Sequence, residues 1–476
     1  MHQGSSRWTL LGIVLLGIAL FCALPYVAAA VVRGAILAQG AVERAAFAAG
    51  GSPWSWRFRE PGDVVAGRAF GGGALTPGKA GLTLRAVDGS GMEIGLPLSR
   101  PADLTRLDVL TWHGEASTSG IYALSLRETL EGPLVQATLG TLSPDALGQP
   151  IHLAGLAWTD AAGRPAARPT RAAMLRLRVI LPAGSTFTLD QAALVPAAGA
   201  VAPRALDLPT GLSAETLLAW RDTQRERDPL VTFGHAPVPH AGPAWAPWLP
   251  LVGYLLLLGA RAWQVLRQGR DPSAARSPVR KGDLADAALV LIGPLWFIAG
   301  LGLSTHPSPE GVALLGAGVA YALLLGARRI VPRWHWLGAW RDAAWPMLAI
   351  PVALALVLTA GHAPTWPPIS RVLLYLGWAL FQQWLLLAIV GALLARALPR
   401  PWAVLLTALA FALLHTPNGL LMQLCFVAEL GWAGWYFHRR ALLPVALAHA
   451  ASAVLLQAGL AGGLLRSLEV SARFLG

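Results

Sequence analysis

The chain has 476 residues, of which 55% are hydrophobic and only 13% are charged, and its mean hydropathy is +0.53. With several uninterrupted apolar runs of about 20 residues, this composition excludes a soluble globular protein and indicates an integral membrane protein. The net charge of +12 comes almost entirely from arginine, which is typical of basic loops beside a membrane and argues against nucleic-acid binding. Cys22 and Cys425 both lie in apolar segments, so the pattern predicts no disulfide.

The first predicted element is a membrane helix within residues 1–33, where Arg7 precedes an apolar run from Leu10 to Ala30. Small residues from Ala28 to Ala30 would suit a cleavable signal sequence. The continuation of the apolar run beyond Ala30 favours a retained anchor instead. Both interpretations export the segment that follows.

Residues 50–198 differ in character, because apolar and polar residues alternate in several short segments. From Leu175 to Leu181 every second residue is apolar, and Arg176 and Arg178 fall on the opposite face. Such alternation predicts strands with one buried face, and the Gly- and Pro-rich segments between them predict turns. We expect an exported all-β sandwich, jelly-roll-like, inserted after the first helix. Its last strands resemble those of carbohydrate-binding jelly rolls, so carbohydrate binding, partner docking and a plain spacer role all stay open.

Residues 199–244 form a predicted linker that is rich in proline and charge. Within it, the segment from Leu212 to Arg227 is typical of a short helix, because Ser213 offers an N-cap and Glu215 follows in the first turn. We interpret this segment as a connector to the membrane domain.

The remaining residues, 245–465, are predicted to form a polytopic helical membrane domain, which with the N-terminal run gives about nine spans. The predicted spans of this domain are Trp248–Leu266, Leu284–Leu303, Val312–Leu325, Trp345–Ala360, Leu373–Leu394, Trp402–His415, Leu420–Phe437 and Leu442–Leu460. Basic residues cluster in four connecting loops, which fall on one side if the spans alternate, and the positive-inside rule makes that side cytoplasmic. We therefore expect a bacterial inner-membrane protein with a periplasmic sandwich.

Polar side chains inside the spans are informative, because an unsatisfied polar group in hydrocarbon costs several kcal/mol. They gather in the last four spans and are Gln382, Gln383, His415, Gln423, Glu429, His449 and Gln457. One interpretation is that they only join neighbouring helices through hydrogen bonds. The other is that some of them form a functional site.

Several of these residues follow one another in a particular order. Gln382 and Gln383 come first, then Phe411 and His415 four residues apart, and then His449 after Leu-Ala. This order resembles that of the CPBP family of intramembrane endopeptidases, the type II CAAX-prenyl-protease group. The family pattern is Glu-Glu-x3-Arg, then Phe-x3-His, then His-x3-Asn.

The resemblance covers residues 373–456, and the chain departs from the family pattern at four positions. Both glutamates are replaced by glutamine, Leu387 stands at the arginine position, and Ala453 stands at the asparagine position. In the family, the glutamates and histidines are thought to activate a water that attacks the scissile carbonyl, while the asparagine helps to hold the oxyanion. A glutamine amide does not titrate, so it cannot replace a glutamate as general base.

Five residues are candidates for the site. His415 or His449 would be the base, with Gln382 and Gln383 orienting a water or polarising the carbonyl. Glu429 is the one carboxylate deep in this region of the sequence, where it is costly unless paired or protonated, so it could be a relocated catalytic group. Two histidines and Glu429 would also suit a zinc ion with an open position, although their spacing is not that of a helical metal motif. No other cofactor is expected.

Two functions from different classes follow from these residues. The first is an intramembrane endopeptidase with altered catalytic residues, which cleaves a membrane protein or peptide and in which Asn418 could supply the missing amide. The second is a non-catalytic relative that acts as a scaffold or binds a lipid or peptide, while its sandwich captures a protein or carbohydrate partner. Both functions need the lipid bilayer. We expect Gln383, His415 and His449 to line one pocket with Gln382 beside them, and a wide separation of these side chains would contradict the family resemblance and any catalytic role.

Overall fold

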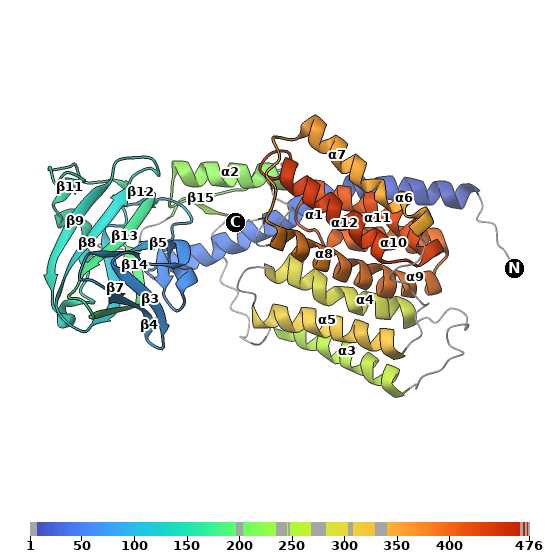
Figure 1. Ribbon diagram of the computed structural model, residues 1–476, viewed down its shortest axis with the longest axis horizontal. Helices are drawn as coiled ribbons and strands as arrows, with labels where there is room; N and C mark the ends of the chain where they lie inside the picture. Colours follow the sequence, from blue (N-terminus) through green and yellow to red (C-terminus); the bar gives the residue numbers. More distant parts are fainter. Residues whose placement is uncertain are drawn as a thin grey trace. The chain divides into compact units, whose positions relative to one another are not determined.

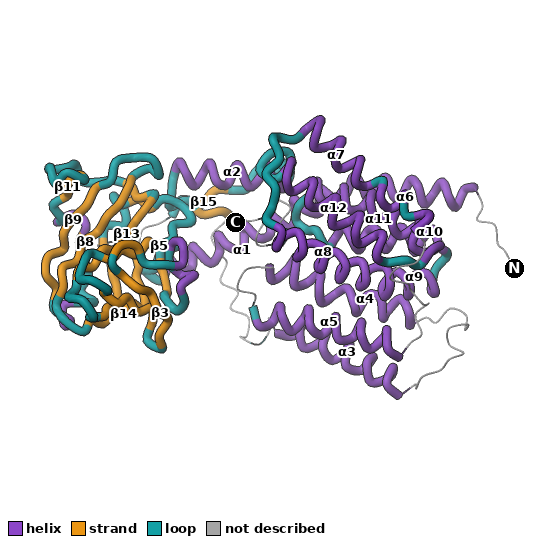
Figure 2. Tube along the Cα trace, viewed as in Figure 1, coloured by secondary structure: helices purple, strands orange, loops and turns teal. Residues whose placement is uncertain are grey.

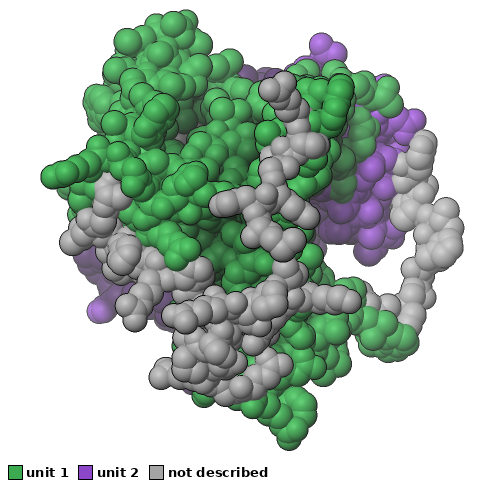
Figure 3. All heavy atoms as spheres, turned by 90° about the vertical axis from the view of Figure 1, so that its right-hand side faces the viewer, with its two compact units in different colours: residues 1–34, 210–218, 239–476 green, residues 35–209, 219–238 purple. Residues whose placement is uncertain are grey.

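The computed structural model divides the chain into two compact units (Figure 1). The structure describes residues 7–196, 203–234, 245, 248–267, 282–302, 308–328, 340–466, 470, 471 and 474. Unit 1 comprises residues 1–34, 210–218 and 239–476, and unit 2 comprises residues 35–209 and 219–238 (Figure 3). The long sheets belong to unit 2, whereas unit 1 is built from helices (Figure 2). Two helices, α1 (Arg7–Ala48) and α2 (Ala214–Arg227), contribute residues to both units.

Unit 2 contains two large antiparallel sheets. The first has the order β10 (Ile151–His152), β7 (Val109–Ala116), β14 (Thr186–Val195), β4 (Gly81–Ala86) and β3 (Gly73–Gly78), with β1 (Ser55–Arg57) also paired to β14. The second has the order β11 (Trp158–Asp160), β9 (Val135–Leu142), β8 (Gly120–Arg127), β13 (Met174–Ile180), β5 (Met92–Leu96) and β2 (Phe70–Gly71). The smaller pairs are β12 (Arg171–Ala172) with β6 (Ala102–Asp103), and β15 (Ala205–Leu206) with β16 (Thr232–Phe233). The short 3₁₀ helices are η1 (Pro61–Asp63), η2 (Val65–Gly67), η3 (Pro144–Ala146) and η4 (Leu153–Gly155).

The alternating sequence pattern produces the core of the sandwich. Along β13 every second side chain is buried, and Arg176 lies on the outer face, where its Nη1 is 3.3 Å from Oε2 of Glu93 on β5. Between the sheets, the rings of Trp112, Tyr122 and Phe187 pack edge to face, with centroids 5.5 to 6.3 Å apart. Burial of each such ring stabilises the fold by about 1.5–3 kcal/mol. The predicted all-β sandwich is confirmed.

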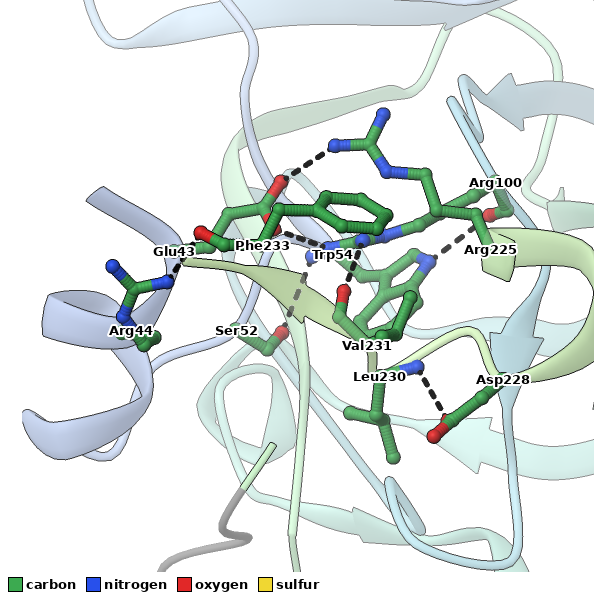
Figure 4. Close-up of polar contacts among 10 residues, drawn as sticks. All are labelled: Glu43, Arg44, Ser52, Trp54, Arg100, Arg225, Asp228, Leu230, Val231 and Phe233. Atoms are coloured by element: carbon green, nitrogen blue, oxygen red, sulfur yellow. Dashed lines mark hydrogen bonds and ion pairs between the residues drawn. The ribbon is translucent and has the colours of Figure 1, made fainter. Parts of the chain in front are cut away.

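A buried charge cluster joins the end of α1 to the rest of unit 2 (Figure 4). Glu43 accepts a hydrogen bond from Arg225 at 3.2 Å and forms an ion pair with Arg100, also at 3.2 Å, and all three side chains are at least nine-tenths buried. Arg100 also donates to the Val231 carbonyl at 3.1 Å, and Arg44 donates to the Phe233 carbonyl at 2.6 Å. Burial lowers the pKa of Arg225 to about 10, so its charge persists at neutral pH. Removal of one partner from such a buried cluster costs about 3–5 kcal/mol.

The segment predicted as a connector contains the expected helix. α2 begins after Ser213, whose hydroxyl accepts from the backbone N–H of Thr216 at 3.2 Å and so acts as the N-cap. The C-terminal half of this helix, from residue 219, belongs to unit 2, as do residues 203–209. Residues 199–202 and 235–244 of the predicted linker lie outside the described residues.

Unit 1 is a bundle of apolar helices. After the first part of α1 come α3 (Leu249–Arg267), α4 (Gly282–Leu295), the π-helix η7 (Trp296–Gly302), α5 (Pro309–Arg328), η8 (Trp340–Asp342), α6 (Ala344–Met347) and α7 (Ala349–Ala360). They are followed by α8 (Ile369–Gln383), the π-helix η9 (Trp384–Gly391), α9 (Ala392–Ala397), α10 (Arg400–Leu413), α11 (Gly419–Arg439) and α12 (Leu443–Leu460). Among the described residues, eight helices are long and apolar enough to cross a membrane, and α10 is a shorter apolar helix. The predicted polytopic membrane domain is confirmed, and its predicted span Trp402–His415 corresponds to the short α10.

Helix packing in unit 1 depends on close contacts and on satisfied polar groups. α12 packs against α7 and α8, while α5 packs against α3 and α4 (Figure 1). Gly293 permits the α4–α5 contact, because a Cβ there would collide with the Leu314 carbonyl. In the same region the buried Asp286 accepts from Arg261 at 2.9 Å and from the Tyr321 hydroxyl at 2.7 Å, which joins α3, α4 and α5.

A proline inside α1 leaves one backbone carbonyl without its helical donor, and a side chain on α11 supplies that hydrogen bond. Pro25 has no N–H, so the carbonyl of Phe21, four residues earlier, lacks its helical donor. The Gln423 side chain on α11 donates to this carbonyl at 3.1 Å. Gly419, also on α11, allows the approach, because an added Cβ would lie 3.2 Å from Cα of Pro25. This hydrogen bond gives the intramembrane Gln423 a structural role.

We predict that Gln423→Leu destabilises unit 1 by about 1–3 kcal/mol, since it leaves the Phe21 carbonyl unsatisfied in an apolar interior. Pro25→Ala should restore the helical donor, so the same Gln423→Leu change should be nearly neutral in that background. Thermal unfolding of the detergent-solubilised protein measures this double-mutant cycle. Equal effects in both backgrounds would contradict the assigned role.

The loop between α7 and α8 is joined to the end of α12 by a histidine. The two ring nitrogens of His362 lie 2.9 Å from the Ala363 carbonyl and 2.8 Å from the Ala461 carbonyl. Carbonyl oxygens only accept, so both contacts are satisfied together only by the protonated imidazolium. These carbonyls therefore raise the pKa of His362 above its usual 6.5. Thr365 adds a backbone hydrogen bond to the Ala458 carbonyl at 2.8 Å.

We predict that His362 makes thermal stability depend on pH. Its pKa is raised in the folded state, so its contribution is complete below the unfolded value of 6.5 and is lost as the pH rises through the folded value. The melting temperatures of the wild type and His362→Gln should differ most near pH 5.5 and converge near about pH 8.5. His152→Gln, at an exposed position on β10, is the matched control. A difference independent of pH would refute this prediction.

Candidate functional site

The aromatic ring of Phe411 brings the two predicted histidines together. Phe411 lies fully buried on α10, with its ring centroid 4.7 Å from that of His415 and 5.2 Å from that of His449. Trp432 on α11 packs against both His449 and Phe411, with centroids 5.5 Å and 6.3 Å apart, respectively. Three helices and the α10–α11 loop therefore hold both imidazoles within one aromatic cluster.

His415 lies in the five-residue loop that follows α10. Its Nδ1 is 2.8 Å from the Phe411 carbonyl, and because a carbonyl only accepts, Nδ1 carries the proton. Nε2 of the neutral ring is then a free hydrogen-bond acceptor. The loop satisfies its own backbone, since the N–H groups of His415, Thr416 and Asn418 donate to the carbonyls of Ala412, Leu413 and His415, respectively. Irregular backbone among membrane helices requires such pairing.

Gln383 connects the second histidine to the buried carboxylate. Its Nε2 donates to Oε2 of Glu429 at 3.1 Å and lies 3.5 Å from Nδ1 of His449. An amide nitrogen only donates, so Nδ1 of His449 accepts, and the ring proton is on Nε2. The two histidines thus have opposite tautomers: His415 keeps an accepting Nε2, and His449 keeps a donating Nε2.

Glu429 and Gln383 are both fully buried, and each has one oxygen, Oε1, without a hydrogen-bond partner among the described residues. A buried acceptor without a donor costs about 1–3 kcal/mol. A purely structural link between helices would leave neither oxygen unpaired, so stability alone does not explain this arrangement of Glu429 and Gln383. The nearest polar partner of Glu429 is Gln383, and through it Glu429 orients His449.

The histidines line a cavity of about 1330 Å³ in unit 1. Gln382, His415 and His449 are among its lining residues, whereas Gln383 and Glu429 are not. Gln382 and Gln383 are consecutive in α8 and so point about 100° apart. The structure thus brings together the five predicted residues in two layers, with three on the cavity wall and two behind it. The sequence pattern predicts Gln383 on the cavity wall with Gln382 beside it. In the structure Gln382 lines the cavity, and Gln383 lies behind it.

The structure also bears on two other features of the candidate site. The Asn418 side chain accepts from the backbone N–H of Leu421 at 3.1 Å, so it caps α11 and its oxygen does not serve the cavity. Across the described residues, no group of three or more His, Cys, Asp or Glu side chains is placed to hold a metal ion. Ala453, at the family's asparagine position, lines the cavity with a methyl group, and Leu387 is buried in η9.

Sequence reasoning did not identify most of the cavity wall. One face of α8 supplies Arg371, Leu374, Tyr375 and Trp378 at helical spacing, ahead of Gln382. The signal was present as an i, i+3, i+4, i+7 series, but in a helix surrounded by apolar residues this spacing alone does not separate a cavity wall from a lipid-facing side.

The fold and this site define a polytopic membrane protein with a buried histidine–glutamine centre. Residues 379–455 match the family model described as Type II CAAX prenyl endopeptidase Rce1-like. The match begins in α8 just before Gln382 and ends in α12 beyond His449, so it contains the whole two-layer site. A comparison with curated proteins found no match.

We predict that Gln383→Glu alone destabilises unit 1, and more strongly at pH 8 than at about pH 6. It would place a second carboxylate near Glu429, at a position where the present contact is 3.1 Å, and two like charges at that distance cannot both ionise. The exchange Gln383→Glu with Glu429→Gln keeps a single carboxylate and should recover most of the stability. Melting temperatures of the three variants provide the measurement. If the exchange is no better than the single change, the pairing is wrong.

Proposed function

We propose that this protein is a non-hydrolytic member of the Rce1-like type, which binds an apolar chain in its intramembrane cavity. The observation that carries the proposal is the composition of the cavity wall. Among the described lining residues there are two site histidines and Gln382, but no aspartate or glutamate. The family mechanism needs a carboxylate at the water, and the nearby Glu429 is directed to Gln383 behind the wall.

The remaining groups are suited to binding. Most of the cavity is apolar, with leucine, valine, alanine and aromatic side chains from α7, α8, α11 and α12. A cavity of this kind takes up hydrocarbon and orients it through a few polar groups. Gln382 and Nε2–H of His449 donate hydrogen bonds, and Nε2 of His415 accepts one. This supports a ligand with a long apolar part and at least one polar group, such as a lipid or an apolar peptide.

A second candidate function is an endopeptidase that works with histidines alone. It is favoured by the opposite tautomers, because Nε2 of His415 can take a proton from water while Nε2–H of His449 donates to the developing oxyanion. The hydroxide equivalent then adds to the scissile carbonyl of a membrane protein or peptide, and the proton held by His415 passes to the leaving amine. Glu429 is a positioning residue in this scheme, since it acts through Gln383 on His449.

A peptidase assay separates the two functions. We expect the purified wild type in lipid nanodiscs to cleave no prenylated CAAX-type peptide. Gln382→Glu should create turnover, because it places a carboxylate on the wall that the histidines share, and His415→Ala in that background should remove it. Gln457→Glu, also on the cavity wall but two turns beyond His449, is the matched control and should stay silent. Turnover by the wild type that His415→Ala and His449→Ala abolish would overturn the non-hydrolytic proposal in favour of the second candidate.

We propose an inner-membrane location in a bacterial cell, with the sandwich in the periplasm and available to a protein or carbohydrate partner. The support is the distribution of arginine between the loops, which the positive-inside rule converts into an orientation. Reporter insertions in the β11 turn at Gly163 and in the sequence after Arg276 should report opposite compartments. A common compartment would eliminate this topology.

A further inference from the structure

One face of α8 connects the histidine–glutamine centre to an arginine. Arg371, Tyr375, Trp378 and Gln382 follow one another at helical spacing along the cavity wall, with Leu374 between the first two. Arg371 precedes Gln382 by eleven residues, which at 1.5 Å per residue separates their Cα atoms by about 16 Å along the helix. The cavity therefore has a guanidinium toward one end and the amide and imidazoles farther along.

The walls between these points are open to the surroundings. On α8, Leu374 and Trp378 keep 69% and 43% of their surface exposed, and across the cavity Leu348 and Val352 keep 51% and 59%. All four belong to segments of membrane-spanning length, so the surroundings are lipid. A molecule already in the bilayer can enter the cavity sideways, without leaving the hydrocarbon.

The charges on the wall favour an anion. Among the described residues, Arg371 has no salt-bridge partner, and no carboxylate lines the cavity to neutralise it. The other basic groups on the wall are histidines, of which His438 lies at the end of α11. A guanidinium is permanently charged and binds phosphate oxygens in a bidentate manner.

We propose that the cavity binds one anionic phospholipid, with its phosphate on Arg371 and an acyl chain along the exposed apolar wall toward Gln382. This inference rests on the proposed binding function and adds the class of ligand. The lipid class follows from the lateral opening, and the anionic head follows from the unbalanced arginine.

An arginine at the end of a membrane helix also attracts anionic lipids from the bulk bilayer, without a specific site. Bulk attraction has no fixed stoichiometry and does not depend on the shape of the cavity. A specific site should saturate at one lipid per chain and should respond to changes on the opposite wall.

Native mass spectrometry of the full-length protein in detergent tests the proposal, with phosphatidylglycerol and phosphatidylcholine of identical acyl chains as probes. The wild type should form a saturating one-to-one complex and prefer the anionic lipid by roughly tenfold, because the choline ammonium of phosphatidylcholine offsets the phosphate charge that attracts Arg371. Arg371→Gln should remove this preference, and Arg371→Lys should retain part of it. Arg328→Gln, at the end of α5 and off the cavity wall, is the matched control and should change nothing.

Two tryptophan variants of α7 test the location. Val352→Trp would fill the cavity and should weaken the binding of both lipids, whereas Leu354→Trp lies on the same helix but off the wall and should have no effect. Melting temperatures identify any variant that fails to fold. If Arg371→Gln keeps the anionic preference while Val352→Trp displaces both lipids, the head-group assignment fails and the binding function stands. If Val352→Trp displaces neither lipid, the cavity does not bind lipid and the inference is overturned.

Discussion

The structure of unit 1 depends on one constraint: no backbone polar group can be left unpaired among apolar helices, because hydrocarbon offers no replacement for water. The chain breaks helical regularity at Pro25 and again between α10 and α11, and in each case a specific partner restores the pairing. Gln423 supplies the donor that proline lacks, and the N–H groups of the loop around His415 donate to carbonyls at the end of α10 and within the loop. Because the backbone groups of the α10–α11 loop are hydrogen-bonded, His415 can lie outside a helix among the membrane helices.

The chemistry of the site is decided by its neighbours rather than by the two histidines themselves. The Phe411 carbonyl fixes the proton of His415 on Nδ1, and the Gln383 amide fixes that of His449 on Nε2. Glu429 acts one step farther away, through Gln383. The glutamine that replaces an expected glutamate therefore has a definite task, because a carboxylate at position 383 would compete with Glu429 and could not donate to His449.

Much of the architecture could be predicted from the sequence, because both periodicities are strong. Alternation around Arg176 predicted the sandwich, and long apolar runs predicted the membrane helices. The two-layer site could not be predicted, since adjacent residues such as Gln382 and Gln383 point in different directions, and only the packing of α8 determines which one meets the cavity. Nor did the sequence signal that Glu43 would fix the end of α1 within unit 2, because its arginine partners lie 57 and 182 residues farther along the chain.

The contact between Gln423 and Phe21 joins residues 402 positions apart and so has a consequence for biogenesis. Ribosomes make α1 before α11, so the Phe21 carbonyl lacks its Gln423 donor until α11 has been synthesised and inserted. The entropic cost of closing so large a loop grows only slowly, by about 0.6 kcal/mol for each doubling of its length. The large separation along the chain therefore adds little to the entropic cost of forming this contact, whereas the order of synthesis delays it.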